Sequence, residues 1–523
     1  MDTSINRRTF VAGATLGAAT LAALSAVRAE RALADEAVDY AGSVAETVEC
    51  DIVVCGSGPS GLSAAVEAGE RGARVVLLES QPNLGGNGNI LSGLMGVNSK
   101  LAEEQGIHVD AAEVVNREVS TFSYRVDGLR WRDLCNDSGA NVDWLVEHGV
   151  EFMPVSDGDM FEAPLTYHGL LAGENEADNG IATPLLNALP NLDVTTYTST
   201  PAKEIIMEDG KAAGVYAERE DGSILEVRAG AVILATGGYG SDIERLESLL
   251  GTEDVYYAGF PGHNGDGIDM AARAGARNMT IGDPTIMVNL GVPGTPSPWV
   301  LSEMQLDGKC IWVNENAERF VDESCAILVK QYPVNAALTQ RACYGFCDDK
   351  MPNDETNMAY ITAAGPMKGF FQMPKDNLDA VANTDEAKIW RADTIEEVAE
   401  LCGLGDALVE TVKNYNELCA AGHDSEFLKD PQYLVPFDTP PYYVWKNGLA
   451  CTTTLGGVHT DRKTRALTEN NEVIPNLYAV GVDGCELFRS FYTLSTPSAC
   501  NANNINTGRT AAREACESLG IGA

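Results

Sequence analysis

The chain has 523 residues and is too long for one simple hydrophobic core, so more than one domain is expected. Apolar residues make up 45% of it, as in an ordinary globular protein. The net charge of −40 excludes a protein that binds nucleic acids or anionic membranes through a basic surface, and it favours a basic docking partner.

The first segment, residues 1–34, has the pattern of a twin-arginine export signal. Arg7-Arg8 precede an uncharged run rich in Ala, Gly and Thr, and small residues suited to cleavage follow it. The run is only weakly apolar, which favours a cleaved signal over a retained membrane anchor. We therefore predict a mature chain that begins near Glu30 or Asp35, lies in the periplasm or at the cell surface, and does not insert stably into a membrane.

The strongest pattern is a strand, a glycine-rich turn, a helix and a second strand. Asp51–Cys55 is a short apolar run, and GSGPSG follows it directly at residues 56–61. Residues 63–71 carry Ala and Leu with helical spacing, and residues 74–78 form a second apolar run that ends at Glu79. This order is typical of a dinucleotide-binding βαβ unit, which is far more specific than a glycine motif alone.

The three glycines of this turn have different roles in such a unit. Gly56 allows the tight turn, Gly58 lets the backbone approach a pyrophosphate, and Gly61 lets the helix pack on the strand. The helix N-terminus offers free N–H groups to the phosphates, and Glu79 can accept hydrogen bonds from a ribose. The cofactor contacts expected in this unit are Gly56, Ser57, Gly58, Pro59, Ser60, Gly61, Glu79 and Ser80.

A second set of small and amide residues follows. The run GGNGN lets the backbone cross close to a flat ligand, and its expected contacts are Gly86, Asn87, Gly88 and Asn89. The buried strand expected at residues 231–235 ends at Thr236-Gly237, at the edge where parallel sheets bind ligands. We therefore include Thr236 and Gly237 among the cofactor contacts.

The thirteen cysteines are scattered, and none lies in a CxxC pattern. This excludes haem attachment and argues against zinc and iron–sulfur sites, so no metal is expected. The odd number argues against a disulfide framework, and most of the thiols should be buried as small apolar groups.

The remaining chain indicates a discontinuous α/β fold. Residues 35–48 read as an acidic linker without periodicity, and residues 49–240 as the first part of a Rossmann-like nucleotide domain. In that part residues 111–150 look helical and residues 193–228 look like an antiparallel meander.

The composition of the chain changes after residue 240. Residues 241–446 are richer in turns and prolines and read as an inserted α+β capping domain, with a helix at 394–419. Residues 447–523 return to the nucleotide domain with a strand at 476–480 and a last helix at 498–519.

Several further motifs follow in a fixed order: ILATGGYG, NGDGIDMAARAGA, VNENAERFVDE, TTTLGGVHTD, VIPNLYAVG and the terminal NTGR. With the glycine motifs, they make the chain resemble the fumarate reductase/succinate dehydrogenase flavoprotein family, in its soluble exported branch, over about residues 49–518. It is also similar to the urocanate reductase and ketosteroid dehydrogenase members. The resemblance implies FAD, a mobile capping domain and a flavin ring at the domain interface.

The resemblance also implies how FAD is held. Succinate dehydrogenases tether it to a His soon after the GG loop, and no His occurs between Glu79 and His108. FAD is therefore expected to be noncovalent. A pyridine-nucleotide disulfide reductase is excluded, because the chain has neither a second GxGxxG nor a redox cysteine pair after the first acid.

The sequence leaves the family pattern at three positions. The family's proton-donating Arg, its substrate-binding His and a substrate-clamping Arg correspond to Ile327, Thr453 and Ser495. These neutral residues cannot clamp or polarise a dicarboxylate. We therefore expect a neutral or aromatic, enone-like acceptor, with electrons from a separate donor such as a cytochrome c or a quinol-linked protein.

The candidate catalytic residues are Tyr492 and Arg489, which lie in the loop before the last helix. In family branches that reduce other alkenes or dehydrogenate ketosteroids, a Tyr here lies against flavin and substrate. Arg489 would lower the pKa of Tyr492 or orient it. Further cofactor contacts are Ala202 and Asp483, the latter with the ribityl chain. Asp266, His263 and His168 remain either site residues or structural ones.

The leading hypothesis is an anaerobic respiratory reductase of an activated C=C bond that uses hydride from flavin N5. Three alternatives stay open: a dehydrogenase of a steroid-like ketone, a fumarate-type reductase with a rearranged site, and a flavin-binding subunit without catalysis.

Overall fold

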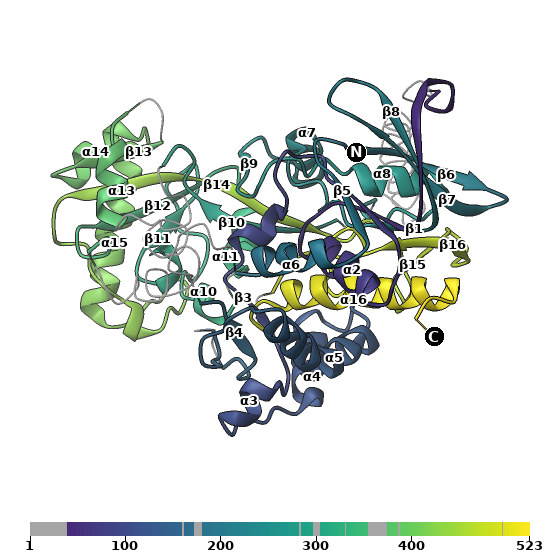
Figure 1. The fold of residues 1–523 in the computed structure, drawn as a ribbon. Coiled ribbons are helices and arrows are strands. Elements are labelled where there is room, and N and C mark those ends of the chain that lie inside the picture. Colours follow the sequence, from purple (N-terminus) through teal and green to yellow (C-terminus); the bar gives the residue numbers. More distant parts are fainter. Residues whose placement is uncertain are drawn as a thin grey trace, which may run out of the picture.

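The structure is a computed structural model that describes residues 39–158, 162–171, 180–281, 284–295, 304–329, 331–353, 374–384, 388–493 and 495–522. Its two main sheets lie side by side, with helices around each of them (Figure 1). The export signal predicted at residues 1–34 lies outside the described residues.

The larger sheet confirms the α/β class. Its path is β15-β16-β8-β1-β2-β5, and from β16 to β5 all neighbours are parallel. The strands are β1 (Val44–Cys55), β2 (Val75–Leu78), β5 (Val194–Tyr197), β8 (Ile224–Leu234), β15 (Arg465–Leu467) and β16 (Val473–Ala479). The hairpin β6 (Ala202–Glu208) and β7 (Lys211–Glu218) extends β8.

Two predicted boundaries in this sheet were wrong. Strand β1 begins at Val44, inside the predicted linker, because its first half pairs with β8 from Ile224 onward. The strands expected at 224–228 and 231–235 are one strand, β8, which is held by β1 on one side and by β7 and β16 on the other. Pairing along a long neighbour extends a strand beyond its apolar stretch, which periodicity in one segment does not reveal.

Helices α2 (Pro59–Glu70) and α16 (Ala499–Leu519) lie together against one face of the larger sheet (Figure 1). They approach closely: a Cβ at Gly508 would lie 2.2 Å from the carbonyl oxygen of Ser60. Below them in Figure 1 are α3 (Lys100–Glu104), α4 (Ala111–Thr121) and α5 (Gly128–Glu147). α6 (Ala182–Ala188) lies beside α2, and the short pair β3 (Gly93–Met95) and β4 (Tyr167–Gly169) completes this part. The helical prediction for 111–150 is thus confirmed as two helices, whose N-caps are Asp110 and Asp127.

The smaller sheet has the order β10-β14-β12-β11, with β9 and β13 also on β14. Its strands are β9 (Val255–Tyr257), β10 (Thr285–Gly291), β11 (Ile311–Val313), β12 (Cys343–Asp348), β13 (Ile389–Ala392) and β14 (Tyr442–Leu455). The predicted domain boundary at 446 therefore falls inside β14, which continues past it in register with β10.

The helices near this sheet are short. They are α7 (Ile243–Leu250), α10 (Cys325–Leu328), α11 (Tyr332–Ala337), α13 (Pro374–Val381) and α14 (Ile395–Leu401), with one longer helix, α15 (Gly405–Ala421). α8 (Asp266–Arg273) packs on β6 of the larger sheet instead. The single helix predicted at 394–419 is two, because the backbone turns left-handed at Gly403 (φ +80°) and Gly405 (φ +56°).

A buried ionic network holds this region together. Arg319 lies 2.9 Å from Glu323 and 3.0 Å from Asp424, and Lys429 lies 3.1 Å from Glu323. All four side chains are at most 2% exposed. The RFVDE motif thus supplies two members of a structural cluster, since a buried charge needs such partners.

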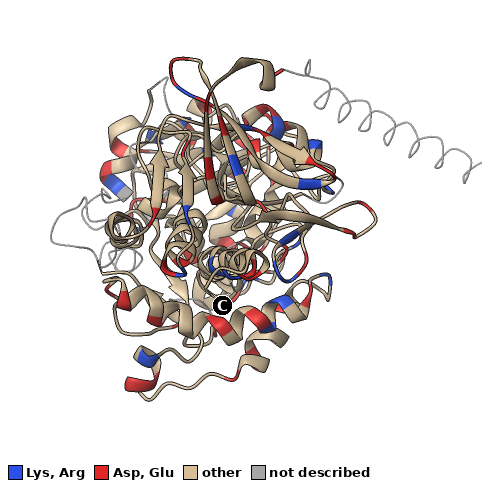
Figure 2. Ribbon diagram, turned by 45° about the vertical axis from the view of Figure 1, so that its right-hand side comes forward, with Lys and Arg blue, Asp and Glu red and all other residues tan. Residues whose placement is uncertain are grey.

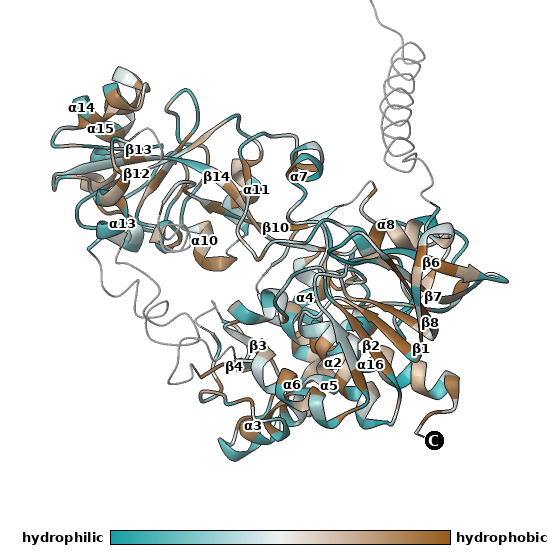
Figure 3. Ribbon diagram, turned by 45° about the horizontal axis from the view of Figure 1, so that its top comes forward, coloured by the Kyte–Doolittle hydropathy of each residue, from teal (hydrophilic) through white to brown (hydrophobic). Residues whose placement is uncertain are grey.

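The surface and the thiols agree with the composition. Apolar residues concentrate along the central strands of the larger sheet (Figure 3), and acidic and basic side chains are interspersed over the outer elements (Figure 2). All thirteen cysteines are free and eleven are buried, as predicted. Within the described residues, no helix has both the length and the apolar character needed to cross a membrane.

Candidate active site

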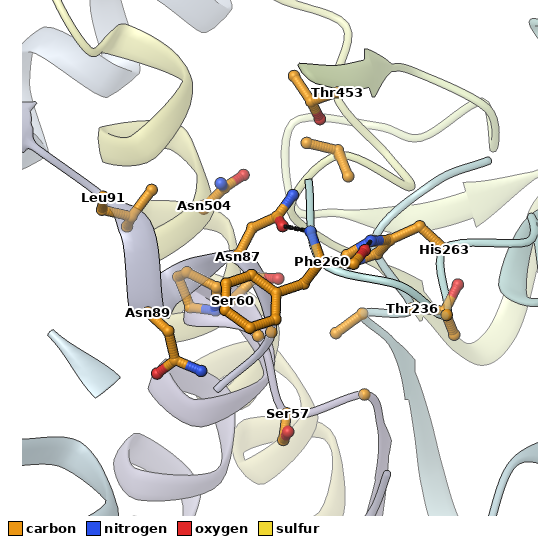
Figure 4. A pocket seen from close by; sticks show the side chains of 18 of the residues that line it. Ser57, Ser60, Asn87, Asn89, Leu91, Thr236, Phe260, His263, Thr453 and Asn504 are labelled. Atoms are coloured by element: carbon orange, nitrogen blue, oxygen red, sulfur yellow. Dashed lines mark hydrogen bonds between the residues drawn. The ribbon is translucent and has the colours of Figure 1, made fainter. Parts of the chain in front are cut away.

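A cavity of about 580 Å³ lies where the two sheets meet. The loops after β1, β2, β8 and β16 line it, as do Met287 and Asn289 of β10 and Thr452 and Thr453 of β14. It therefore opens at the carboxyl ends of parallel strands, where open α/β sheets bind ligands. Figure 4 shows side chains from these separate elements turned towards one space.

The glycine-rich turn forms one wall of the cavity, and its three glycines differ in their surroundings. Gly56 has φ +107°, and its Cβ would lie 2.3 Å from the carbonyl oxygen of Ala235. A Cβ at Gly61 would lie 1.9 Å from the carbonyl oxygen of Gly56. A Cβ at Gly58 would meet nothing within 4 Å, so this glycine keeps a space open at the start of α2.

The start of α2 leaves backbone donors available. Its N-cap is Gly58, which has no side chain to cap the helix, and Pro59 follows at the first helical position. The first N–H groups of a helix have no partner within it. Gly58, Pro59 and Ser60 line the cavity, so these donors and the helix dipole suit an anionic group there.

Glu79 lies at the end of β2, buried in the cavity wall. One carboxylate oxygen accepts from the N–H and hydroxyl of Ser57, at 3.0 and 2.5 Å. The other accepts from the Ser80 hydroxyl at 3.1 Å and the Gln81 N–H at 2.8 Å. Glu79 therefore orients the glycine turn through Ser57, in addition to facing the cavity as predicted.

Most of the GGNGN run lies in a 3-10 helix, η2 (Gly86–Ile90), and Asn87 connects this helix to β9 and the loop after it. The Asn87 side-chain oxygen accepts from the Phe260 N–H at 2.8 Å (Figure 4), and its amide donates to the Tyr257 hydroxyl at 3.2 Å. Gly86, Asn87 and Asn89 line the cavity, whereas Gly88 packs against Pro59.

His263 lies close to this helix (Figure 4), and a Cβ at Gly86 would be 4.0 Å from its Nε2. Its Nδ1 lies 2.8 Å from the carbonyl oxygen of Phe260 and 2.7 Å from the Tyr257 hydroxyl. Because a carbonyl only accepts, Nδ1 carries the hydrogen, and because burial lowers the pKa of His263, Nε2 is an acceptor. A Cβ at Gly237 would lie 2.6 Å from Nε2, so the His263 ring leaves no room for a side chain at position 237.

Asp483 does not line the cavity. Its carboxylate accepts from the Thr236 N–H at 2.6 Å, the Thr236 hydroxyl at 2.9 Å and the Gly238 N–H at 2.8 Å. These contacts shape the Thr236-Gly237 turn, which lines the cavity along with Ala202 and Ser80. The contact of Asp483 with a ribityl chain stays a prediction.

Tyr492 lies in the opposite wall and is 3% exposed. Its hydroxyl oxygen accepts from the Cys500 N–H at 3.4 Å, and no described residue accepts its own hydrogen. Burial, with a smaller effect of the neighbouring Cys500 thiol, raises the pKa of Tyr492 well above its ordinary value. The side chain is thus a protonated phenol with a donor to offer.

Arg489 does not line the cavity, and its expected effect on Tyr492 is absent. Its guanidinium lies 3.3 Å from Glu486, which also contacts Arg130 and His459. The pKa of Tyr492 is raised rather than lowered. Arg489 points to a neighbouring acidic side chain instead, so its place beside Tyr492 in sequence was misleading.

The three positions that depart from the family pattern are not brought together. Thr453 lines the cavity. Ile327 lies on α10 near Gly308, and the hydroxyl of Ser495 donates to Glu118 at 2.6 Å. His168 is also outside, because it lies 2.7 Å from the Ser99 hydroxyl in the core. Asp266, at the start of α8, lines the cavity, and burial raises its pKa.

Sequence reasoning missed part of the wall. Besides Met287 and Asn289, the lining includes Leu91, Tyr167, Phe260, Cys500, Asn501 and Asn504. Only the asparagines at the start of the last helix carried a signal. The others come from strands, loops and, for Cys500, the first turn of α16, where the local pattern reports burial but not which side faces a ligand.

Comparison with known proteins identifies the family. The FAD binding domain family matches residues 51–498. The chain belongs to this family. It is 31% identical to a vinyl phenol reductase of Lactiplantibacillus plantarum, over 89% of this chain and 96% of that protein. It is also 28% identical to a urocanate reductase of Eggerthella lenta, over 83% of this chain and 70% of that protein.

Two solved structures share the fold of this family member. An open conformation of a flavocytochrome c3 fumarate reductase matches with a TM-score of 0.72 and 21% identity, over 91% of this chain and 79% of that one. A 3-ketosteroid-delta4-(5alpha)-dehydrogenase of Rhodococcus jostii matches with a TM-score of 0.66 and 22% identity, over 91% and 98%. The predicted resemblance to the fumarate reductase flavoproteins is confirmed.

The residues present fit the FAD that the family binds. The open side of Gly58, the uncapped start of α2 and the cavity that continues from them suit a dinucleotide. The chain is therefore a FAD-dependent oxidoreductase.

Proposed function

We propose that this enzyme reduces an activated C=C bond of a neutral or aromatic, enone-like acceptor. One observation carries the proposal: none of the described residues that line the cavity is a Lys or an Arg. A small dicarboxylate needs cationic side chains to hold it and to polarise its alkene. The wall offers Leu91, Phe260, Met287 and Tyr492 in their place.

FAD, when bound and reduced by the electron donor, would supply the hydride for such a reduction. Tyr492 donates a hydrogen bond to the carbonyl oxygen of an enone-like acceptor, where negative charge develops during the reduction, and a proton from water completes the saturation at the alpha carbon. Its raised pKa favours this role over full release of the proton to carbon, because a buried phenolate would be costly. Thr453 adds a neutral hydroxyl where the family has a cation.

The activities for which several relatives are named support this acceptor class. The relative at 31% identity is a vinyl phenol reductase, and vinyl phenol is a neutral aromatic alkene. A digoxin reductase of Eggerthella lenta is 24% identical over 94% of both chains. Fumarate and urocanate, in the names of other relatives, are carboxylates.

The test is an anaerobic screen. The holoenzyme is reduced with dithionite, and flavin reoxidation is followed after addition of a vinyl phenol, a cyclic enone, fumarate, acrylate or urocanate. We expect reoxidation by a neutral acceptor and little by fumarate. Fast turnover of fumarate would refute the proposal, and oxidation of a saturated steroid ketone without any alkene reduction would establish the dehydrogenase alternative.

We further propose that the protein is exported by the twin-arginine route and receives electrons from a cytochrome c or a quinol-linked protein in respiration. Arg7-Arg8 and the weakly apolar run support export. Export removes access to cytoplasmic NAD(P)H. Arg7→Lys with Arg8→Lys should leave the precursor in the cytoplasm, as seen by fractionation; unchanged export would contradict the route.

A further inference from the structure

A buried carboxylate behind the Tyr492 wall has no role in the chemistry described so far. Glu118 lies near the end of α4 and is 0% exposed. Within the described part of the chain, no Lys, Arg or His forms an ion pair with it, although the Arg117 charge acts on it from nearby. Burial raises the pKa of Glu118. Such a group is costly to bury and calls for an explanation.

Its partners are three hydroxyls of one loop. Ser495 donates to one carboxylate oxygen at 2.6 Å, and Thr496 donates to the same oxygen. Thr493 donates to the other oxygen at 3.2 Å. All three residues lie within four positions after Tyr492 in the chain, so one carboxylate holds the segment that follows the phenol.

Neighbouring residues hold the same loop in the same place. The Arg117 Nε donates to the carbonyl oxygen of Ser495 at 3.1 Å. Before Tyr492, the Phe122 ring packs on those of Phe488 and Phe491, with centroids 5.9 and 5.5 Å apart. α4 and the residue after it thus contact the chain on both sides of Tyr492. Glu118 does so through three hydrogen bonds.

We propose that Glu118 is the positioning residue of Tyr492: it fixes Thr493, Ser495 and Thr496 so that the phenol hydroxyl stays aimed into the cavity. Ser495, the position where the family pattern has a substrate-clamping Arg, thereby serves as an anchor of this loop. The inference rests on the proposed role of Tyr492 in holding a neutral oxygen. A positioning group acts through geometry, and a displacement of about 1 Å can cost about 100-fold in rate.

The test uses phenol as the probe, because it is a neutral oxygen compound of the proposed class. It is titrated into the oxidised holoenzyme, and binding is read from the flavin absorbance. We expect Glu118→Leu to weaken phenol binding about 10-fold, the value of one good hydrogen bond. Glu118→Gln should restore most of the affinity, because its amide can still accept from Ser495 and Thr496.

A double-mutant cycle separates positioning from general stability. In a Tyr492→Phe background, Glu118→Leu should have no further effect on the phenol Kd, because the hydroxyl that it positions is gone. Glu113→Leu, on the exposed face of the same helix, is the matched control and should leave the Kd unchanged. If the losses from Tyr492→Phe and Glu118→Leu simply add, the positioning role is refuted.

Hydrogen exchange over residues 487–500 gives a reading that needs no ligand. It should be faster in Glu118→Leu than in the wild type and in Glu113→Leu. Unchanged exchange and an unchanged Kd would overturn the inference and leave the proposed function intact. Wild-type protein that does not bind phenol would contradict the proposed function. The hydrogen-exchange comparison alone would then show whether Glu118 holds the loop in place. If Glu118→Leu does not fold, Ser495→Ala with Thr496→Val removes two of the three bonds and is expected to act in the same direction.

Discussion

The two ends of the cavity are built from different kinds of contact. At the α2 end the wall is backbone: a Cβ at Gly56 or Gly61 would collide with a carbonyl oxygen, and Glu79 accepts from backbone N–H groups. At the Tyr492 end the wall is made of side chains from separate strands, loops and the start of α16. The first end tolerates almost no substitution, whereas the second can change its residues without unfolding the sheet, which is how one fold serves different acceptors.

The largest effect is expected from Gly58→Val. The space beside Gly58 is open, so the protein should fold normally, yet the new side chain would occupy the place of the pyrophosphate. We expect complete loss of FAD, measured as a colourless protein with an unchanged circular dichroism spectrum. Wild-type protein should release FAD on denaturation, because no covalent tether is expected; flavin that stays in the precipitate would contradict this.

The next largest effect is expected at the other end. Tyr492→Phe keeps the ring and removes the only hydrogen that the phenol offers to the cavity. We expect the rate of flavin reoxidation by a neutral acceptor to fall about 100-fold, as when an oxyanion donor is removed, with FAD content unchanged. Tyr332→Phe, on α11 outside the cavity lining, is the control; equal rates for the two variants would make Tyr492 a packing residue.

A moderate effect is expected where a side chain supports the backbone end. Asp483→Asn would turn an amide donor towards N–H groups of Thr236 and Gly238. We expect FAD affinity to fall about 10-fold, the cost of leaving one such donor unpaired. Asp221→Asn is matched to it, because Asp221 also accepts from a backbone N–H and a hydroxyl, at an exposed turn. Ultrafiltration of free flavin measures both.

The smallest effect concerns pH. Burial raises the pKa of Tyr492, so its protonated, active form should persist above the pH at which an ordinary tyrosine, with a pKa of about 10, loses its proton. We expect kcat/KM for a neutral acceptor to show no decline from Tyr492 up to about pH 10. A fall by half near pH 9 that disappears in Tyr492→Phe would show that the phenol is not buried in solution.

Sequence alone determined the nucleotide end because each of its signals is local. The strand, the glycines at fixed spacing, the helix and Glu79 lie within one stretch, and the chemistry of a tight turn dictates the residue type at each position. The order of the later motifs identified the family, and the helical character of residues 111–150 and 498–519 could also be predicted from the sequence. Those predictions needed no knowledge of distant contacts.

Only the tertiary structure decided the other end. It directed Arg489 to Glu486, used Asp483 to shape a turn, kept Ile327 away from the cavity and joined Ser495 to Glu118. It also brought Met287 and Asn289 of β10 into the lining of the same cavity as Tyr492, which follows them by about two hundred residues in the chain. The direction of a side chain depends on which element packs behind it. That is fixed by contacts between distant segments, which no local pattern records.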